Sequence, residues 1–323
     1  MRFRNSIRSG AAHIKTKTSL IILSISVGVL GFASVASAAS QSTIYDNIPS
    51  PTPGNVPSIG YEATSTSEFG SQVDLDGTAR KDPKITVLMS SWACKSGTWN
   101  NKNCITNPGS TFTHPVTIKV YNVNSDDSAG SLIVSSTKTF TMPYRPTADD
   151  GTNCNDANGS AGLWWDGTTC LNGKAFKISF DLNGTTLPDN VIISVAYNTS
   201  HYGYSPIGGA NACNSTPQGC PYDSLNVGTS PAPTVGDSLP TADDAYVNSS
   251  WADFYCDSGA SGSGTFRLDS DCWTGYLPAI QVEATGKGGN NGHHHRHNNH
   301  KDGDKNHHKK YNGWNGFYNL SHN

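Results

Sequence analysis

The chain has 323 residues, of which 35% are hydrophobic and 15% are charged, and its formal net charge is −3 at pH 7. The first 38 residues carry five cations and no acid, and residues 287–323 carry a net charge of +4, so the body between them has a net charge of −12. Such an acidic body excludes a protein that binds nucleic acid through clustered cations, and its length allows a large buried core.

The N-terminus has the three parts of a secretory signal peptide. Five basic side chains within residues 2–17 precede the apolar run LIILSISVGVLGFA at residues 20–33, and the small residues ASA at 36–38 provide a cleavage site. The sequence therefore predicts a signal peptide over residues 1–38 and a protein that is secreted or held at the cell surface. The alternative is an N-terminal membrane anchor, which the short apolar run disfavours. No transmembrane segment is expected after signal removal, because no later stretch is apolar for long enough.

Residues 39–285 are predicted to form β-strands. The runs rich in β-branched and aromatic residues are 85–94, 116–123, 131–142, 175–182, 191–198 and 279–285. In the second run, apolar and polar residues alternate: Val116, Thr117, Ile118, Lys119, Val120 and Tyr121. Alternation of this kind is typical of an antiparallel sheet with one buried face. We expect an all-β fold, a single large antiparallel β-sandwich of the jelly-roll kind. The pentapeptide PTADD, at 146–150 and again at 240–244, keeps two smaller domains open as an alternative.

All eight cysteines follow the predicted signal peptide. An even number of cysteines in an exported chain indicates disulfides. Each pair of neighbouring cysteines encloses a stretch rich in Gly, Asn, Ser and Asp, so we expect four short disulfide-bridged loops: Cys94–Cys104, Cys154–Cys170, Cys213–Cys220 and Cys256–Cys272. Other pairings stay open from the sequence alone. Zinc binding is the weaker alternative, because no C-x-x-C pair occurs.

Aromatic residues gather in these loops. Trp164 and Trp165 precede Asp166 between the second pair of cysteines. Adjacent strand residues point to opposite faces, so the two rings cannot both be buried, and this makes the pair the leading candidate for a surface platform. Aromatic rings stack on the C–H groups of sugars while polar side chains bind the hydroxyls, which predicts a glycan or cell-wall polymer as the partner. The alternative is that the tryptophans pack against the disulfides.

A second aromatic loop follows the predicted strand 191–198. His201 lies beside Tyr202 and Tyr204, and these three residues complete the candidate ligand-binding set. Packing within the loop is the favoured alternative for them. The other histidine of the body, His114, precedes Pro115 and is expected at the surface, where a strand begins.

An Asx-rich loop offers candidate calcium ligands. Oxygen atoms of carboxylates and amides suit Ca²⁺, and the candidates are Asp149, Asp150, Asn153, Asn155 and Asp156. Their spacing does not match an EF-hand. The alternative is a set of turns, which Asn and Asp also favour.

The C-terminal segment 286–323 begins with a glycine-rich hinge and continues as a basic, His-rich tail that we expect to be disordered. Neutral imidazoles bind Zn²⁺, Ni²⁺ and Cu²⁺, and the candidate ligands are His293, His294, His295, His297, His300, His307 and His308. The sequence does not decide between a physiological metal site and a weakly binding, solvated tail.

Three stretches carry a resemblance to a known family. Residues 43–70, 194–208 and 246–284 resemble an uncharacterised family of secreted bacterial proteins, found in actinobacteria and their relatives, some with C-terminal surface-anchoring signals. The resemblance covers nearly the whole body and not the tail. It implies a location in the cell envelope or outside it, and it brings no activity and no catalytic residues. The L-P-x-T-G sorting motif does not occur in this chain.

The sequence contains no G-x-S-x-G or H-E-x-x-H motif and no phosphate-binding glycine loop. We therefore predict a non-enzymatic binding or adhesion protein of the cell exterior that binds glycan through loop aromatics. Two alternatives stay open: an extracellular metal-binding protein that acts through its tail, and a glycan-active hydrolase. No cofactor is required by this interpretation, and the oligomeric state is left open.

Overall fold

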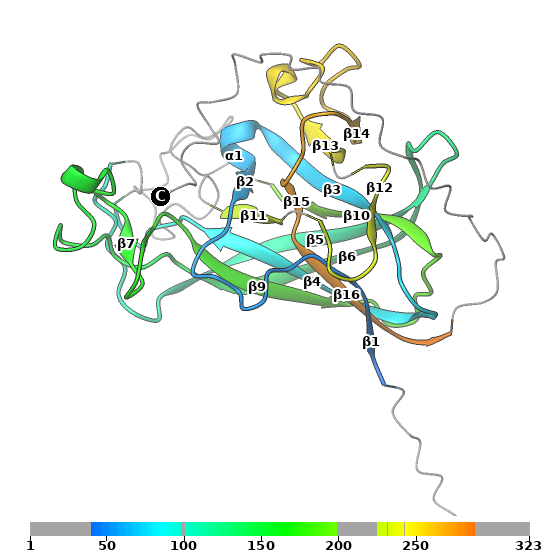
Figure 1. Cartoon of the computed structure of the whole chain (residues 1–323), viewed down its shortest axis with the longest axis horizontal. Helices are drawn as coiled ribbons and strands as arrows, with labels where there is room; N and C mark the ends of the chain where they lie inside the picture. The colour runs from blue at the N-terminus through cyan, green and yellow to red at the C-terminus, as the bar shows by residue number, and fades with distance from the viewer. Residues whose placement is uncertain (1–39, 98–100, 199–224, 231, 242, 288–323) are drawn as a thin grey trace, which may run out of the picture. The chain divides into compact units, whose positions relative to one another are not determined.

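The computed structural model describes residues 40–97, 101–198, 225–230, 232–241 and 243–287. Its strands form two antiparallel seven-stranded sheets and one two-stranded hairpin (Figure 1). The first sheet contains β1 (Ser42–Asp46), β2 (Ser58–Gly60), β4 (Ala79–Ser91), β9 (Lys174–Asp181), β11 (Leu225–Ser230), β15 (Leu277–Pro278) and β16 (Ile280–Lys287). The second contains β3 (Thr66–Asp74), β5 (Thr111–Val123), β6 (Ala129–Pro143), β10 (Asn190–Ala196), β12 (Asp237–Leu239), β13 (Ala245–Ser249) and β14 (Arg267–Asp269). The hairpin consists of β7 (Trp164–Trp165) and β8 (Cys170–Leu171).

The first sheet is built around β4. This strand pairs with β9 along one edge and with β16 along the other, and β1 lies beyond β16. The last residues of β4, Met89–Ser91, pair with β11, which carries β2 on its far edge. All of these pairings are antiparallel, so the sheet brings the first and the last described strands together.

The second sheet has the strand order β14-β13-β3-β10-β5-β6. Its longest pairing is the β5–β6 hairpin, whose register runs from Thr111 opposite Pro143 to Val123 opposite Ala129. Burial along β5 alternates as the sequence predicts, with Val116, Ile118 and Val120 fully buried.

One cluster of buried side chains has members in both sheets. Ile85 and Val87 of β4 belong to it together with Val116, Ile118 and Val120 of β5. Two sheets that bury their facing sides against each other form a β-sandwich. The predicted all-β antiparallel sandwich is therefore confirmed.

Helical structure is minor in the part of the chain that is described. It consists of α1 (Tyr61–Thr64) and short 3₁₀ turns at Asp156–Asn158 and Ala252–Phe254. None of the helices among these residues has the length and apolar character needed to span a membrane.

The surface position predicted for His114 is wrong. His114 lies inside β5, on the side that faces the core, and only 1% of it is exposed. Its ring meets Tyr197 edge-on at 5.6 Å between centroids. Burial lowers the pKa of His114 to about 4, because the charged imidazolium is poorly solvated there.

Candidate binding site at the disulfide-bridged loops

Three of the four predicted disulfides are present: Cys94–Cys104, Cys154–Cys170 and Cys256–Cys272. The neighbour pairing is confirmed for these six cysteines. The fourth predicted pair, Cys213–Cys220, lies outside the described residues.

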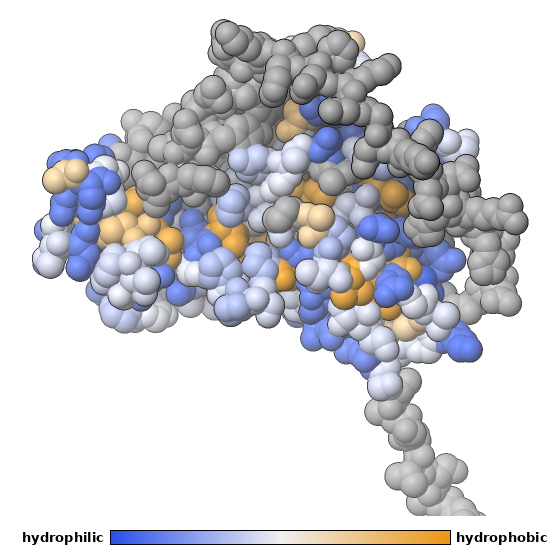
Figure 2. Space-filling model, viewed as in Figure 1, coloured by the Kyte–Doolittle hydropathy of each residue, from blue (hydrophilic) through white to orange (hydrophobic). Residues whose placement is uncertain are grey.

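The segments that contain the first two disulfides pack against each other, and together they form what we call the loop end, residues 93–97, 101–106 and 144–173. The backbone N–H of Ala148 donates to the carbonyl of Cys104 at 3.0 Å, and that of Thr106 donates to Oγ1 of Thr147 at 2.9 Å. In Figure 1 this region includes β7, at the left of the view. Figure 2 shows a hydrophilic outer rim there, with hydrophobic residues beside it.

The two adjacent tryptophans of the loop end point in opposite directions. Trp164 is 6% exposed, and its Nε1 donates to the carbonyl of Gly173 at 2.7 Å. Trp165 is 37% exposed and pairs with Cys170 across the hairpin. Of the predicted pair, only the ring of Trp165 therefore faces solvent, while Trp164 anchors the hairpin to the sandwich.

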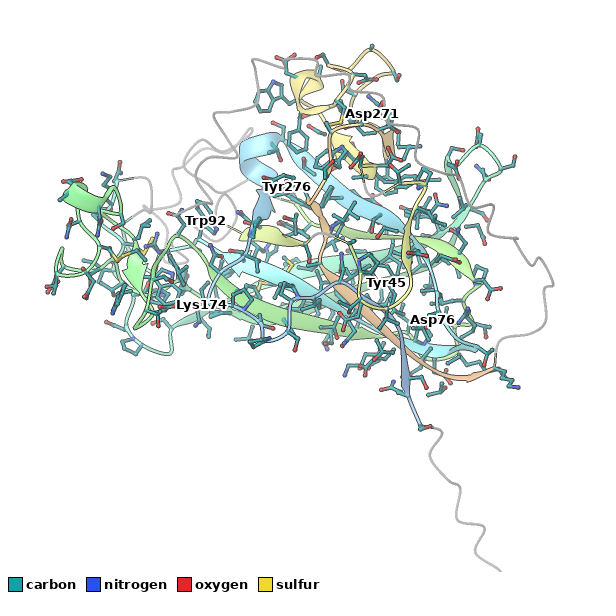
Figure 3. All side chains as sticks on the ribbon, in the orientation of Figure 1. Tyr45, Asp76, Trp92, Lys174, Asp271 and Tyr276 are labelled. Carbon is teal, nitrogen blue, oxygen red and sulfur yellow. A yellow bond between two sulfur atoms is a disulfide. The ribbon has the colours of Figure 1, made fainter. Side chains whose placement is uncertain are left out.

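Beneath the hairpin, Trp164 lies against the start of β9. The Nζ atom of Lys174 lies 5.6 Å from the centroid of the Trp164 ring, and Figure 3 shows Lys174 and Trp92 at this end of the first sheet. Nε1 of Trp92 donates to Oγ of Ser90 at 3.1 Å. Gly173 is required here, because a Cβ on it would lie 2.3 Å from that oxygen. These contacts attach the base of the hairpin to the first sheet.

Asp166, a predicted ligand-binding residue, shapes the turn between β7 and β8. Its Oδ1 accepts the backbone N–H groups of Thr168 and Thr169, each at 2.8 Å. These bonds, that of Thr169 above all, lower the pKa of the Asp166 carboxyl. Asp166 follows Trp165 in the chain and is exposed, so its carboxylate is negative and accessible at the tip of the hairpin.

Two groups of predicted site residues are not described by the structure. His201, Tyr202 and Tyr204 fall outside the described residues, as do all seven candidate metal ligands of the tail, His293, His294, His295, His297, His300, His307 and His308. Their sites stay predictions.

The first two candidate calcium ligands bond to their own loop. Asp149 accepts the backbone N–H groups of Gly151, Asn153 and Cys154 at 3.1, 2.8 and 2.9 Å. These bonds, led by that of Cys154, lower the pKa of Asp149 to about 2. Asp150 accepts the backbone N–H of Thr152 at 3.0 Å.

The other three candidate calcium ligands also have partners within the loop end. Asn153 donates from Nδ2 to Oδ1 of Asp149 at 3.0 Å, and Asn155 caps the following 3₁₀ turn. Asp156 lies 3.3 Å from Nζ of Lys102 in the first disulfide loop. The five residues are thus brought together as turn and capping groups, and calcium binding by them stays a prediction.

A buried polar cluster that sequence reasoning did not identify lies on the outer face of the second sheet. Glu68 is 4% exposed. It accepts from Nζ of Lys119 at 2.6 Å, from the hydroxyl of Tyr121 at 2.8 Å and from that of Ser194 at 2.6 Å. Burial and the neighbouring carboxylate raise the pKa of Tyr121. The outward positions of Lys119 and Tyr121 were predictable from the alternation of β5, but their partner on β3 was not.

One further group of acid and sulfur atoms occurs among the described residues. Side-chain atoms of Cys256, Asp269 and Cys272 lie within 4.8 Å of one another. The two sulfurs are joined as a disulfide, and Asp269 accepts from Nε1 of Trp273 at 2.8 Å. In this oxidised state the group has no thiolate to offer a metal.

No family model, no curated protein and no solved structure matches the chain. The resemblance to a family of secreted bacterial proteins therefore stays a prediction.

Proposed function

We propose that the protein is a non-enzymatic binding or adhesion protein of the cell exterior, and that it binds carbohydrate at the loop end through the ring of Trp165. One observation carries the proposal: Trp165 is 37% exposed on a hairpin whose facing residue, Cys170, is bridged to Cys154. Because the disulfide braces the backbone that carries the ring, less conformational entropy is lost when a sugar stacks on it than on a loose loop. The signal-peptide pattern and the disulfides support a location outside the cytoplasm.

The acidic residues of the loop end favour binding over hydrolysis. Glycoside hydrolysis needs two carboxyl groups that face the scissile bond. Asp149 and Asp166 instead accept backbone N–H groups of their own turns, and Asp156 lies beside Lys102. We therefore assign these carboxylates to the architecture of the loops, with Asp166 also available to a sugar hydroxyl.

A glycan array probed with the mature protein tests the proposal. Binding should be found for the unmodified protein, and Trp165→Ala should weaken it by about tenfold, since a well-placed aromatic contact contributes about 1–1.5 kcal/mol. Trp165→Phe should retain part of the affinity because it keeps an aromatic face.

The matched control is Ile105→Ala, which removes another exposed apolar side chain, 59% exposed, from the neighbouring disulfide loop. This variant should bind as the unmodified protein does. Equal binding by Trp165→Ala and the unmodified protein would refute the role of the ring, and an array without any signal would refute carbohydrate as the ligand.

A further inference from the structure

Arg145 is a fully buried cation at the base of the loop end. It lies two residues after the end of β6, is 0% exposed, and donates its backbone N–H to the carbonyl of Ala93 at 2.9 Å. Nη2 of its side chain donates to the carbonyl of Gly162 at 2.8 Å. The side chain therefore joins the end of β6 to the second disulfide loop, two residues before Trp164.

Among the residues that the structure describes, most of the hydrogen-bonding capacity of this guanidinium is unused. Nε and Nη1 of Arg145, which carry the larger share of its N–H donors, find no hydrogen-bond partner there. The contrast is Arg80, which is 4% exposed. Nε of Arg80 donates to Asp189 at 2.9 Å, and its other nitrogens donate to the carbonyls of Leu75, Asp76 and Ala79. The fold is thus able to satisfy a buried arginine, and at Arg145 it does so only in part.

The charge of Arg145 is also unbalanced by the residues that the structure describes. None of their carboxylates lies within ion-pair distance of it. Asp149 and Asp156, which belong to the same loop end, are engaged with backbone N–H groups and with Lys102. Burial lowers the pKa of Arg145 to about 10, which still leaves it charged at neutral pH. A buried charge is strongly unfavourable unless an opposite charge accompanies it.

We propose that Arg145 is the cationic half of an internal anion site, and that a small monovalent anion, either chloride or a simple carboxylate such as acetate, binds to its Nε and Nη groups. A guanidinium presents planar N–H donors that suit such anions. Because Arg145 connects β6 to the loop that carries Trp164, the bound anion would stabilise the attachment of the loop end to the sandwich. The inference is independent of what binds at Trp165.

Thermal unfolding of the mature protein tests the site. The concentration of sodium chloride is raised from about 1 to about 100 mM, and sodium acetate is tested separately in the same way. The added salt replaces the sodium salt of a bulky sulfonate, so that the ionic strength stays constant. For a site that is half-filled at about 10 mM, this exchange favours the folded state about tenfold. The expected rise in Tm is about 3–6 °C for a domain of this size.

Arg145→Met should lose this rise, because it keeps an apolar stem and removes the charge. Arg80→Lys is the matched control at a buried arginine with a complete set of partners, and it should keep the rise. An unchanged Tm in the unmodified protein, or an equal rise in Arg145→Met, overturns the proposal.

A direct measurement covers the case in which Arg145→Met does not fold. Crystals of the unmodified protein grown in sodium bromide should show an anomalous peak within hydrogen-bonding distance of Nε or Nη1 of Arg145. A map without that peak overturns the proposal.

Discussion

Acidification should destabilise the fold through His114 before any lowered-pKa aspartate titrates. His114 is 1% exposed, and burial lowers its pKa from 6.5 to about 4. Between these two values the unfolded chain takes up a proton on this imidazole and the folded chain does not. The stability that neutral His114 provides is therefore complete above about pH 6.5 and is lost as the pH falls toward 4.

The magnitude follows from the width of that window. Where the unfolded chain holds one more proton than the folded chain, each pH unit changes the free energy of unfolding by about 1.4 kcal/mol. With a pKa lowered from 6.5 to about 4, the free energy of unfolding should therefore fall by roughly 3 kcal/mol as the pH falls across this window. Asp149 and Asp257, whose pKa values are lowered to about 2, act in a separate and more acidic window. Tyr197, which contacts the imidazole, has a pKa well above 10 and stays neutral throughout.

Urea denaturation at a series of pH values from 7.5 to 4 measures the effect, with the free energy of unfolding plotted against pH. His114→Gln should flatten that plot between pH 6.5 and 4, because glutamine does not titrate. This holds whatever the free energy of unfolding of the variant is at pH 7. Phe112→Leu, a change on the same buried face of β5, should lower the curve by the same amount at every pH. If the His114→Gln curve keeps the full slope of the unmodified protein between pH 6.5 and 4, the argument from burial is refuted.

Three further predictions follow from other parts of the molecule. Replacing Cys154 and Cys170 by alanine opens a loop with a sequence separation of 16 and should lower the free energy of unfolding by about 3 kcal/mol; urea denaturation measures this, and a loss below about 1 kcal/mol would contradict the loop-entropy argument. Glu68→Ala leaves the buried hydroxyl of Ser194 and the ammonium of Lys119 without their acceptor, and it should lower the free energy of unfolding by about 2–4 kcal/mol in the same assay. The control variant Lys119→Ala should lower it by less, because the side chain of Lys119 is 29% exposed. Truncation after Lys287 should leave Tm within about 2 °C of the value for the full-length protein and should remove most Zn²⁺ binding. Calorimetry on the full-length protein should show that its Zn²⁺ binding weakens as the pH falls through about 6.5, and tight zinc binding by the truncated protein would place the metal site in the body.

The strands that sequence reasoning identified show either alternation of residue types or an apolar run, as in the fully buried stretches of β4 and β10. Along β5, buried and partly exposed residues alternate from Phe112 to Tyr121, and the alternation of apolar and polar residue types therefore reveals the strand directly. β3 was not predicted, because Glu68, Gly70, Ser71 and Gln72 are all buried there and give it neither alternation nor an apolar run. Its outer face is polar and covered, a condition that depends on tertiary contacts with distant segments.

The position of His114 was misjudged for a related reason. Pro115 suggests the start of a strand, yet β5 begins at Thr111. Pro115 lies before Thr117–Tyr121, the part of β5 that pairs with β10, so among the described strands it pairs with β6 alone. Sheet edges tolerate proline because one row of backbone groups needs no partner. Which strands lie beside a given residue depends on the topology of the sheet, and residue type alone does not predict it.

The disulfides of the candidate site were predictable from the sequence, and so was the exposure of one of its two adjacent tryptophan rings. Short loops closed by neighbouring cysteines, and opposite directions for Trp164 and Trp165, both follow from local sequence. Trp164 is the ring that faces inward, and it does so where its Nε1 meets the carbonyl of Gly173. In the buried polar cluster, the partners of Glu68 lie 51 to 126 residues away along the chain. Such contacts between distant residues carry no local signal.

The place of β16 in the first sheet sets the order in which the molecule can be assembled as the chain emerges from its N-terminus. β16 is inserted between β1 and β4, although it is the last strand described. Among the described strands β1 pairs with β16 alone, so until Lys287 has emerged β1 lacks that partner and the Ala79–Val87 edge of β4 stays open. The loops Cys94–Cys104 and Cys154–Cys170, with sequence separations of 10 and 16, can close long before then. A chain that folds as it emerges would therefore be able to close these cross-links before its first sheet is complete, with an exposed edge available for mispairing in the interval.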